Sequence, residues 1–194
     1  MVGSLILLFT LPLFAAYSQA DEEQCDIEAK PGTMDGYDFF NRNNSRFVMT
    51  NRTYHGRGGL NQTLCPMTGT SVVPSGDHSL IQYFYYTNLS DTDYHQATAL
   101  VNMTFFKDGN DAGYNRMNSQ LESGQDYRLP EPRWQFLYTR NECTVVQVLN
   151  QSQQGESKPI CELWRKDTVD TNHEVSGNSH CCQEYFEAKC NTTV

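Results

Sequence analysis

Short runs of strand-forming residues recur along the chain from residue 46 onward, each bounded by turn-forming residues. We expect about eight strands, at residues 46–54, 63–73, 79–87, 95–106, 133–139, 143–149 and 159–166, with weaker candidates at 114–121 and 125–128. The Gly/Asn/Asp-rich segment 107–113 and the polar segment 151–157 are typical of hairpin loops. Short strands at this spacing favour an antiparallel β-barrel or a β-sandwich.

Two helices flank this strand-rich region. Residues 34–41 favour a short helix before the first strand, and residues 179–189 favour a longer one after the last. In the second segment Cys182, Tyr185, Phe186 and Lys189 recur at helical spacing and define one face. Asn178 or Ser179 is a suitable cap for its first turn.

The side-chain direction of the strand at 95–106 follows from Asn102, which begins an N-x-[ST] sequon. A glycosylated Asn must face water, and side chains alternate along a strand, so Leu100 and Thr104 face outward with it. The inward row is then entirely apolar: Ala99, Val101, Met103 and Phe105. Such a row suits the interior of a barrel, and eight strands can enclose one small ligand.

The chain holds seven such sequons, which indicate a glycosylated secreted protein. They begin at Asn43, Asn51, Asn61, Asn88, Asn102, Asn150 and Asn191. Applied to Asn51, the same alternation predicts Met49 on the outer face and Val48 and Thr50 inside.

The first 20 of the 194 residues lack charged side chains and read as a signal peptide. Their apolar core at 5–16 is followed by Ser18 and Ala20, the small residues that signal peptidase recognises. Residues 21–194 then form a single domain in which we expect no membrane-spanning segment. Its formal charge of −9 argues against nucleic acids and anionic membranes as partners.

All seven cysteines lie after residue 20, and in a secreted protein they predict disulfides. Three disulfides with one cysteine left over allow many pairings, and spacing alone does not select one. The sequence lacks G-x-S-x-G, Walker and H-E-x-x-H motifs, and its histidines are scattered. The cluster from Asp108 to Asp111 suits a hairpin turn better than a calcium loop. We therefore expect neither catalysis nor a metal or other cofactor.

Four motifs together resemble the tick salivary lipocalins of the histamine-binding protein family. Their order and spacing carry the resemblance, which covers most of the chain after residue 20. The motifs are Cys143 with Glu162 and Trp164; Cys181, Cys182, Gln183 and Glu184 with Cys190; Ile81 and Gln82 with Ala97 and Thr98; and Gly113, Tyr114, Asn115 and Arg116.

The resemblance implies an all-β, eight-stranded antiparallel lipocalin barrel with a C-terminal helix packed outside it. Members of this family are secreted in saliva and bind small host mediators, either amines such as histamine and serotonin or lipids such as leukotrienes, fatty acids and cholesterol. Some bind complement protein, so action on host immune proteins through the outer surface is another alternative. The family pattern also implies disulfides Cys25–Cys181, Cys65–Cys190 and Cys143–Cys182, leaving Cys161. This cysteine is then either a buried free thiol or one that bonds Cys143 or another chain.

The resemblance places Glu162 and Trp164 in the barrel interior, where a carboxylate beside an indole suits an amine. Trp134, Tyr83 and Tyr85 are the further expected ligand contacts. The alternative is a structural role, in which an internal Tyr, Arg or water satisfies Glu162 and Trp164 is core.

Three departures from the pattern of histamine binders reduce the expected site. Thr144 and Ala99 occupy positions where those relatives carry carboxylates, and residues 118–120 replace an aromatic pair. The sequence therefore predicts either a single amine site or a mostly apolar ligand.

Overall fold

The computed structural model describes residues 25–28, 34–42, 45–54, 63–72, 78–89, 94–124, 131–149, 158–167 and 178–190. Its strands are β1 (Arg46–Arg52), β2 (Thr63–Val72), β3 (Ser79–Leu89), β4 (Tyr94–Phe106), β5 (Arg116–Ser123), β6 (Arg133–Thr139), β7 (Cys143–Val148) and β8 (Cys161–Asp167). Its helices are α1 (Gly36–Phe40) and α2 (Asn178–Lys189). The predicted signal peptide, the weak strand candidate at 125–128 and the loop at 151–157 lie outside the described residues.

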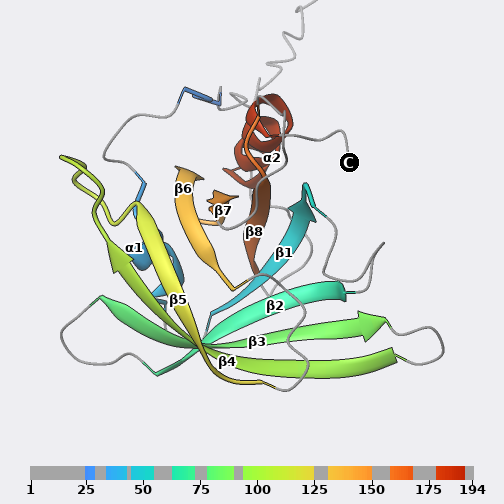
Figure 1. Cartoon of the computed structure of the whole chain (residues 1–194). Coiled ribbons are helices and arrows are strands. Elements are labelled where there is room, and N and C mark those ends of the chain that lie inside the picture. The colour runs from blue at the N-terminus through green and yellow to red at the C-terminus, as the bar shows by residue number, and fades with distance from the viewer. Residues whose placement is uncertain are drawn as a thin grey trace, which may run out of the picture.

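The strands form a closed antiparallel barrel, which decides between the two architectures that the sequence allowed. Each strand pairs with its neighbour in sequence, and β1 also pairs with β8, so the sheet has no free edge. Figure 1 shows the strands curving around a common interior, with α2 beside β6, β7 and β8. The predicted eight-stranded barrel with a short helix and an outer C-terminal helix is confirmed. Among the described residues, no helix has the length and apolar composition that a membrane span requires.

The predicted facing of β4 is confirmed, whereas that of β1 is wrong. The inward row of β4 is buried and Thr104 is exposed. On β1, however, Met49 is buried and Thr50 is exposed, the reverse of the expectation. A bulge between Met49 and Asn51 shifts the pairing with β8, and such a shift interrupts the alternation on which the prediction depended.

Helix α1 packs its aromatic rings into the barrel interior. Asp35 caps the helix, because its Oδ1 accepts a hydrogen bond from Asp38 N. The ring of Phe40 stacks on Trp134 at a centroid distance of 5.5 Å and also contacts Phe47 and Trp164. Where α1 begins, a Cβ atom on Gly36 would lie 2.1 Å from the ring of Phe136, so the close packing here depends on glycine.

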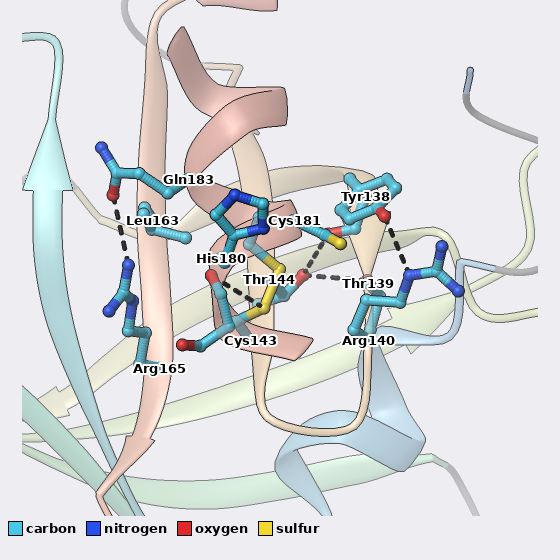
Figure 2. Close-up of a disulfide and its surroundings, with 12 residues drawn as sticks. Tyr138, Thr139, Arg140, Cys143, Thr144, Leu163, Arg165, His180, Cys181 and Gln183 are labelled. Carbon is cyan, nitrogen blue, oxygen red and sulfur yellow. Dashed lines mark hydrogen bonds between the residues drawn. A yellow bond between two sulfur atoms is a disulfide. The ribbon is translucent and has the colours of Figure 1, made fainter. Parts of the chain in front are cut away.

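Three disulfides join α2 and its flanks to the rest of the chain. The pairs Cys25–Cys181 and Cys143–Cys182 are those expected, and Figure 2 shows the surroundings of Cys143 and Cys181. The third expected pair, Cys65–Cys190, is wrong, since Cys190 bonds Cys161 instead. Cys161 is buried and lies on β8, one of the strands that α2 contacts. Cys65 lies in β2, and its side chain is outside the described residues.

Candidate functional site

Glu162 and Trp164 both point into the barrel, as expected from their positions two residues apart on β8. The intervening Leu163 and the preceding Cys161 are on the other face of the strand, where Cys161 bonds the end of α2. The side chain of Glu162 is 3% exposed and that of Trp164 is fully buried. Glu162 is the single charged residue among the buried side chains of the described part of the chain.

Two internal donors hold the Glu162 carboxylate. The hydroxyl of Tyr54 donates to Oε1 at 2.5 Å, and the indole N–H of Trp164 donates to Oε2 at 2.8 Å. Tyr54 follows the end of β1, the strand that pairs with β8 and closes the barrel. This arrangement matches the alternative in which an internal Tyr satisfies Glu162. Each oxygen still has acceptor capacity, because an ionised carboxylate offers about four lone-pair sites.

Trp134 brings a third donor toward the same carboxylate. Its side chain is 1% exposed, and its ring lies 5.5 Å from that of Trp164. The indole nitrogen is buried without a hydrogen-bond partner among the described residues, although its dipole still favours the charged form of Glu162. A buried N–H without a partner is uncommon and marks a place where a ligand acceptor or a water would be stabilised.

The charge state of Glu162 is set by opposing effects. Burial raises the pKa of its carboxyl above the ordinary value of 4.5, and this is the largest effect. The hydrogen bond from Tyr54, that from Trp164, the charge of Arg52 and the dipole of Trp134 act in the opposite direction. The net result is a raised pKa, which means that the empty site favours the protonated carboxyl. A cation that entered the site would lower this pKa again, because an opposite charge nearby favours the ionised form.

The remaining described interior is mainly apolar. Ala99 is buried in the inward row of β4, so the position that carries a Glu in histamine binders presents a methyl group. Thr144 is also buried, and it pairs with Trp164 across β7 and β8. Its hydroxyl contacts the Tyr138 carbonyl and the Thr139 hydroxyl, as the dashed lines in Figure 2 show. Both positions are therefore neutral, as expected.

Tyr83 and Tyr85 do not line the interior, and their predicted role as ligand contacts is wrong. Their side chains are 38% and 43% exposed, and they lie on the outer face of β3. The inward residues of this strand are Leu80, Gln82, Phe84 and Tyr86. Gln82 is fully buried, and its side chain amide accepts a hydrogen bond from Thr68 and donates one to Thr70. The pattern Gln-Tyr-Phe-Tyr-Tyr alternates only weakly in polarity. The sequence alone therefore assigned Tyr83 and Tyr85 to the inner face of the strand, although they lie on its outer face.

Tyr54 is the site residue that sequence reasoning did not identify. It stands near the end of a predicted strand, next to a sequon, and nothing in its local pattern marks it as an interior group. The only available signal was general: a buried Glu requires a donor, and a Tyr is one suitable type.

Among the described residues, the metal-ligating side chains that lie close together are those of Cys25, His180 and Cys181. Cys25 and Cys181 are joined in a disulfide, so neither offers a thiolate. His180 Nε2 lies 3.1 Å from Glu184 on the same helix, and its Nδ1 lies 3.4 Å from Cys25 Sγ. The cluster is therefore a packed helix terminus rather than a set of free metal ligands.

A closed eight-stranded antiparallel barrel with an outer C-terminal helix and an inward carboxylate defines a lipocalin-like, small-molecule-binding protein. The family model described as tick histamine binding protein matches residues 28–194. The chain belongs to this family, as the sequence motifs predicted. A search of curated proteins finds no match to the chain.

Proposed function

We propose that this protein is a secreted scavenger that binds one small amine, such as histamine or serotonin, at Glu162. The observation that carries the proposal is the one buried carboxylate among the described residues, which is inside the barrel and flanked by two indole rings. Residues 1–20 would direct secretion, and three disulfides fit an oxidising compartment. Binding the mediator stoichiometrically would keep it from host receptors, without any catalytic step.

The chemistry of Glu162 suits a protonated amine. An ammonium about 4 Å from the carboxylate would gain roughly 4 kcal/mol at an effective dielectric constant near 20. Tyr54 and Trp164 occupy one acceptor site on each oxygen, so further sites stay available for ligand N–H groups. The faces of Trp164 and Trp134 would add cation–π attraction.

The apolar side of the interior would determine the rest of the ligand. Because Ala99 and Thr144 are neutral, a second ammonium would find no carboxylate at those positions. Phe84 packs edge-on against Trp164 at 6.0 Å, which continues the aromatic lining away from Glu162. We therefore expect a ligand with one cationic group and one apolar or aromatic group.

Calorimetry on the Glu162→Gln variant tests this function. We expect histamine or serotonin to bind at least tenfold more weakly than to the wild type, since Gln retains the shape but not the charge. The exposed Glu187 of α2 provides the matched control, and Glu187→Gln should leave the affinity unchanged. Equal affinities of wild type and Glu162→Gln would contradict the amine mechanism.

A lipid mediator or sterol is the second candidate, and the apolar inward row of β4 favours it. In that case Tyr54 and Trp164 would serve to satisfy Glu162, and the ligand would contact the apolar wall. Native mass spectrometry of protein secreted from eukaryotic cells distinguishes the two, because a lipid carrier would retain a co-purified lipid. Retention of a lipid by the wild type, together with unchanged binding of that lipid in Glu162→Gln, would support this second function.

A further inference from the structure

Two exposed aromatic side chains form a continuous surface on the outside of the barrel. The ring centroids of Tyr83 and Tyr85 are 6.1 Å apart on β3. Together with Leu149, they are the exposed large hydrophobic side chains among the described residues. Single exposed apolar side chains are normal on a surface, whereas two adjacent aromatic rings offer a larger apolar area that a ligand could remove from water.

The strand register places a sequon beside this surface. Ile81 lies opposite Asn102, and Tyr83 lies opposite Leu100, all on the outer face of β3 and β4. Asn102 and Tyr83 are therefore diagonal neighbours, at a typical separation of about 7–8 Å. Within the sequon, Met103 faces inward and Thr104 is exposed, so the acceptor side chain faces away from the interior.

The Asn102 amide nitrogen, to which a glycan would be attached, lies on the β5 side of its side chain. Its oxygen is buried, while its nitrogen Nδ2 donates to Oε1 of the exposed Glu122 at 3.4 Å. Transfer from a lipid-pyrophosphate oligosaccharide would form the Nδ2–C1 bond, break the C1–O bond to pyrophosphate and release one amide proton. The nitrogen would retain one hydrogen, and covering Tyr83 and Tyr85 would require the amide to turn from Glu122 toward β3.

We propose that Asn102 carries an N-linked glycan whose first sugars pack over Tyr83 and Tyr85. The apolar C–H face of a pyranose ring is complementary to the face of an aromatic ring. The sugar hydroxyls stay in water, which makes a glycan a better cover for this surface than bare solvent. The glycan thus removes apolar surface from water without a protein partner. The proposal is independent of what the interior binds.

The experiment uses the full chain secreted from insect cells. Glycopeptide mass spectrometry should find Asn102 occupied. Nitration by tetranitromethane should then modify Tyr83 and Tyr85 several-fold faster in Asn102→Gln than in the wild type, with Tyr114 as the internal reference. Thr104→Ala removes the same sequon without altering Asn102 and should reproduce the faster nitration.

A thermal unfolding cycle tests the coupling between sugar and tyrosines. We expect Asn102→Gln to lower Tm by about 2–4 °C in the wild-type background. In the Tyr83→Ser/Tyr85→Ser background the shift should vanish. For Asn51→Gln, at a sequon on β1, the change in Tm should be equal in the wild-type background and in the Tyr83→Ser/Tyr85→Ser background. An unoccupied Asn102, equal nitration rates, or an Asn102→Gln shift that persists without the tyrosines would overturn the proposal.

Discussion

The two halves of the barrel wall are built differently. In β7, the residues Cys143, Thr144, Val145 and Val146 are buried without interruption, whereas Met117 is the one buried residue of β5 and the others are half-buried or exposed. The cause is α2, which covers the outer face of β6, β7 and β8 (Figure 1). One face of these strands contacts the barrel interior and the other contacts α2. The half of the wall that carries Glu162 and Trp164 is therefore packed on both faces.

Covalent bonds reinforce this difference. Cys143–Cys182 ties α2 to β7, and Cys161–Cys190 ties its end to β8, one residue before Glu162. On the outside of the helix-free half, β3 presents Tyr83 and Tyr85 to solvent. The comparison indicates that the helix-covered half positions the polar group of the site and the other half supplies an apolar wall.

We expect the largest difference in unfolding free energy between substitutions at two neighbouring positions on β3. Phe84→Ala removes a fully buried ring that packs against Trp164, and we expect a loss of about 3–5 kcal/mol of unfolding free energy. Tyr83→Ala, tested in enzymatically deglycosylated protein, should change it by less than about 0.5 kcal/mol. Urea unfolding measures both values. Similar losses would show that the outer face of β3 is also packed.

Removal of a disulfide tests the helix-covered half. The double variant Cys143→Ala/Cys182→Ala should lose about 2–4 kcal/mol, because the unfolded chain regains the entropy of an open loop. The measurement is again the urea midpoint and slope. Thr98→Ala, at an exposed position on β4, is the control and should stay within about 0.5 kcal/mol. Equal midpoints for the double variant and the wild type would exclude the proposed contribution of α2.

A subtler effect is expected in the pH dependence of stability. Burial raises the pKa of Glu162 above 4.5. The stability that the protonated carboxyl contributes is therefore fully present below pH 4.5 and is lost as the pH rises through the raised pKa. Ligand-free wild type should therefore lose stability relative to Glu162→Gln as the pH is raised from 4.5 across the neutral range. Thermal unfolding across this range measures the difference. Parallel curves would mean that the carboxylate ionises without cost, and a bound amine should reduce the gap.

The fold was largely predictable because its strands are separated by clear turn residues. The bounds expected for β6 match the structure, and those of β4 and α2 differ by one residue at most. On α2, the predicted face is confirmed, since Cys182, Tyr185 and Phe186 are buried. These elements have strong local signals, namely a regular apolar period or a dense run of β-branched and aromatic residues.

The errors fall where local pattern lacks the necessary information. The bulge in β1 inverts the facing of Met49, and a bulge leaves no mark in the apolar pattern. Residues 80–86 are almost all apolar or aromatic, so period-two alternation cannot orient Tyr83. The third disulfide depends on how α2 lies across β8, which is a tertiary contact between distant segments. The role of Tyr54 could not be predicted for the same reason, because its contact with Glu162 also joins segments that are distant in sequence.

Gly36 has a consequence for the packing of the barrel interior. Its missing side chain allows α1 to approach Phe136 and to insert Phe40 among the rings around Trp164. Any larger residue at this position would force α1 or the ring of Phe136 to shift, and with α1 the ring of Phe40 beside Trp164. One absent methyl group thus controls how the interior is filled, at a position far in sequence from the acid.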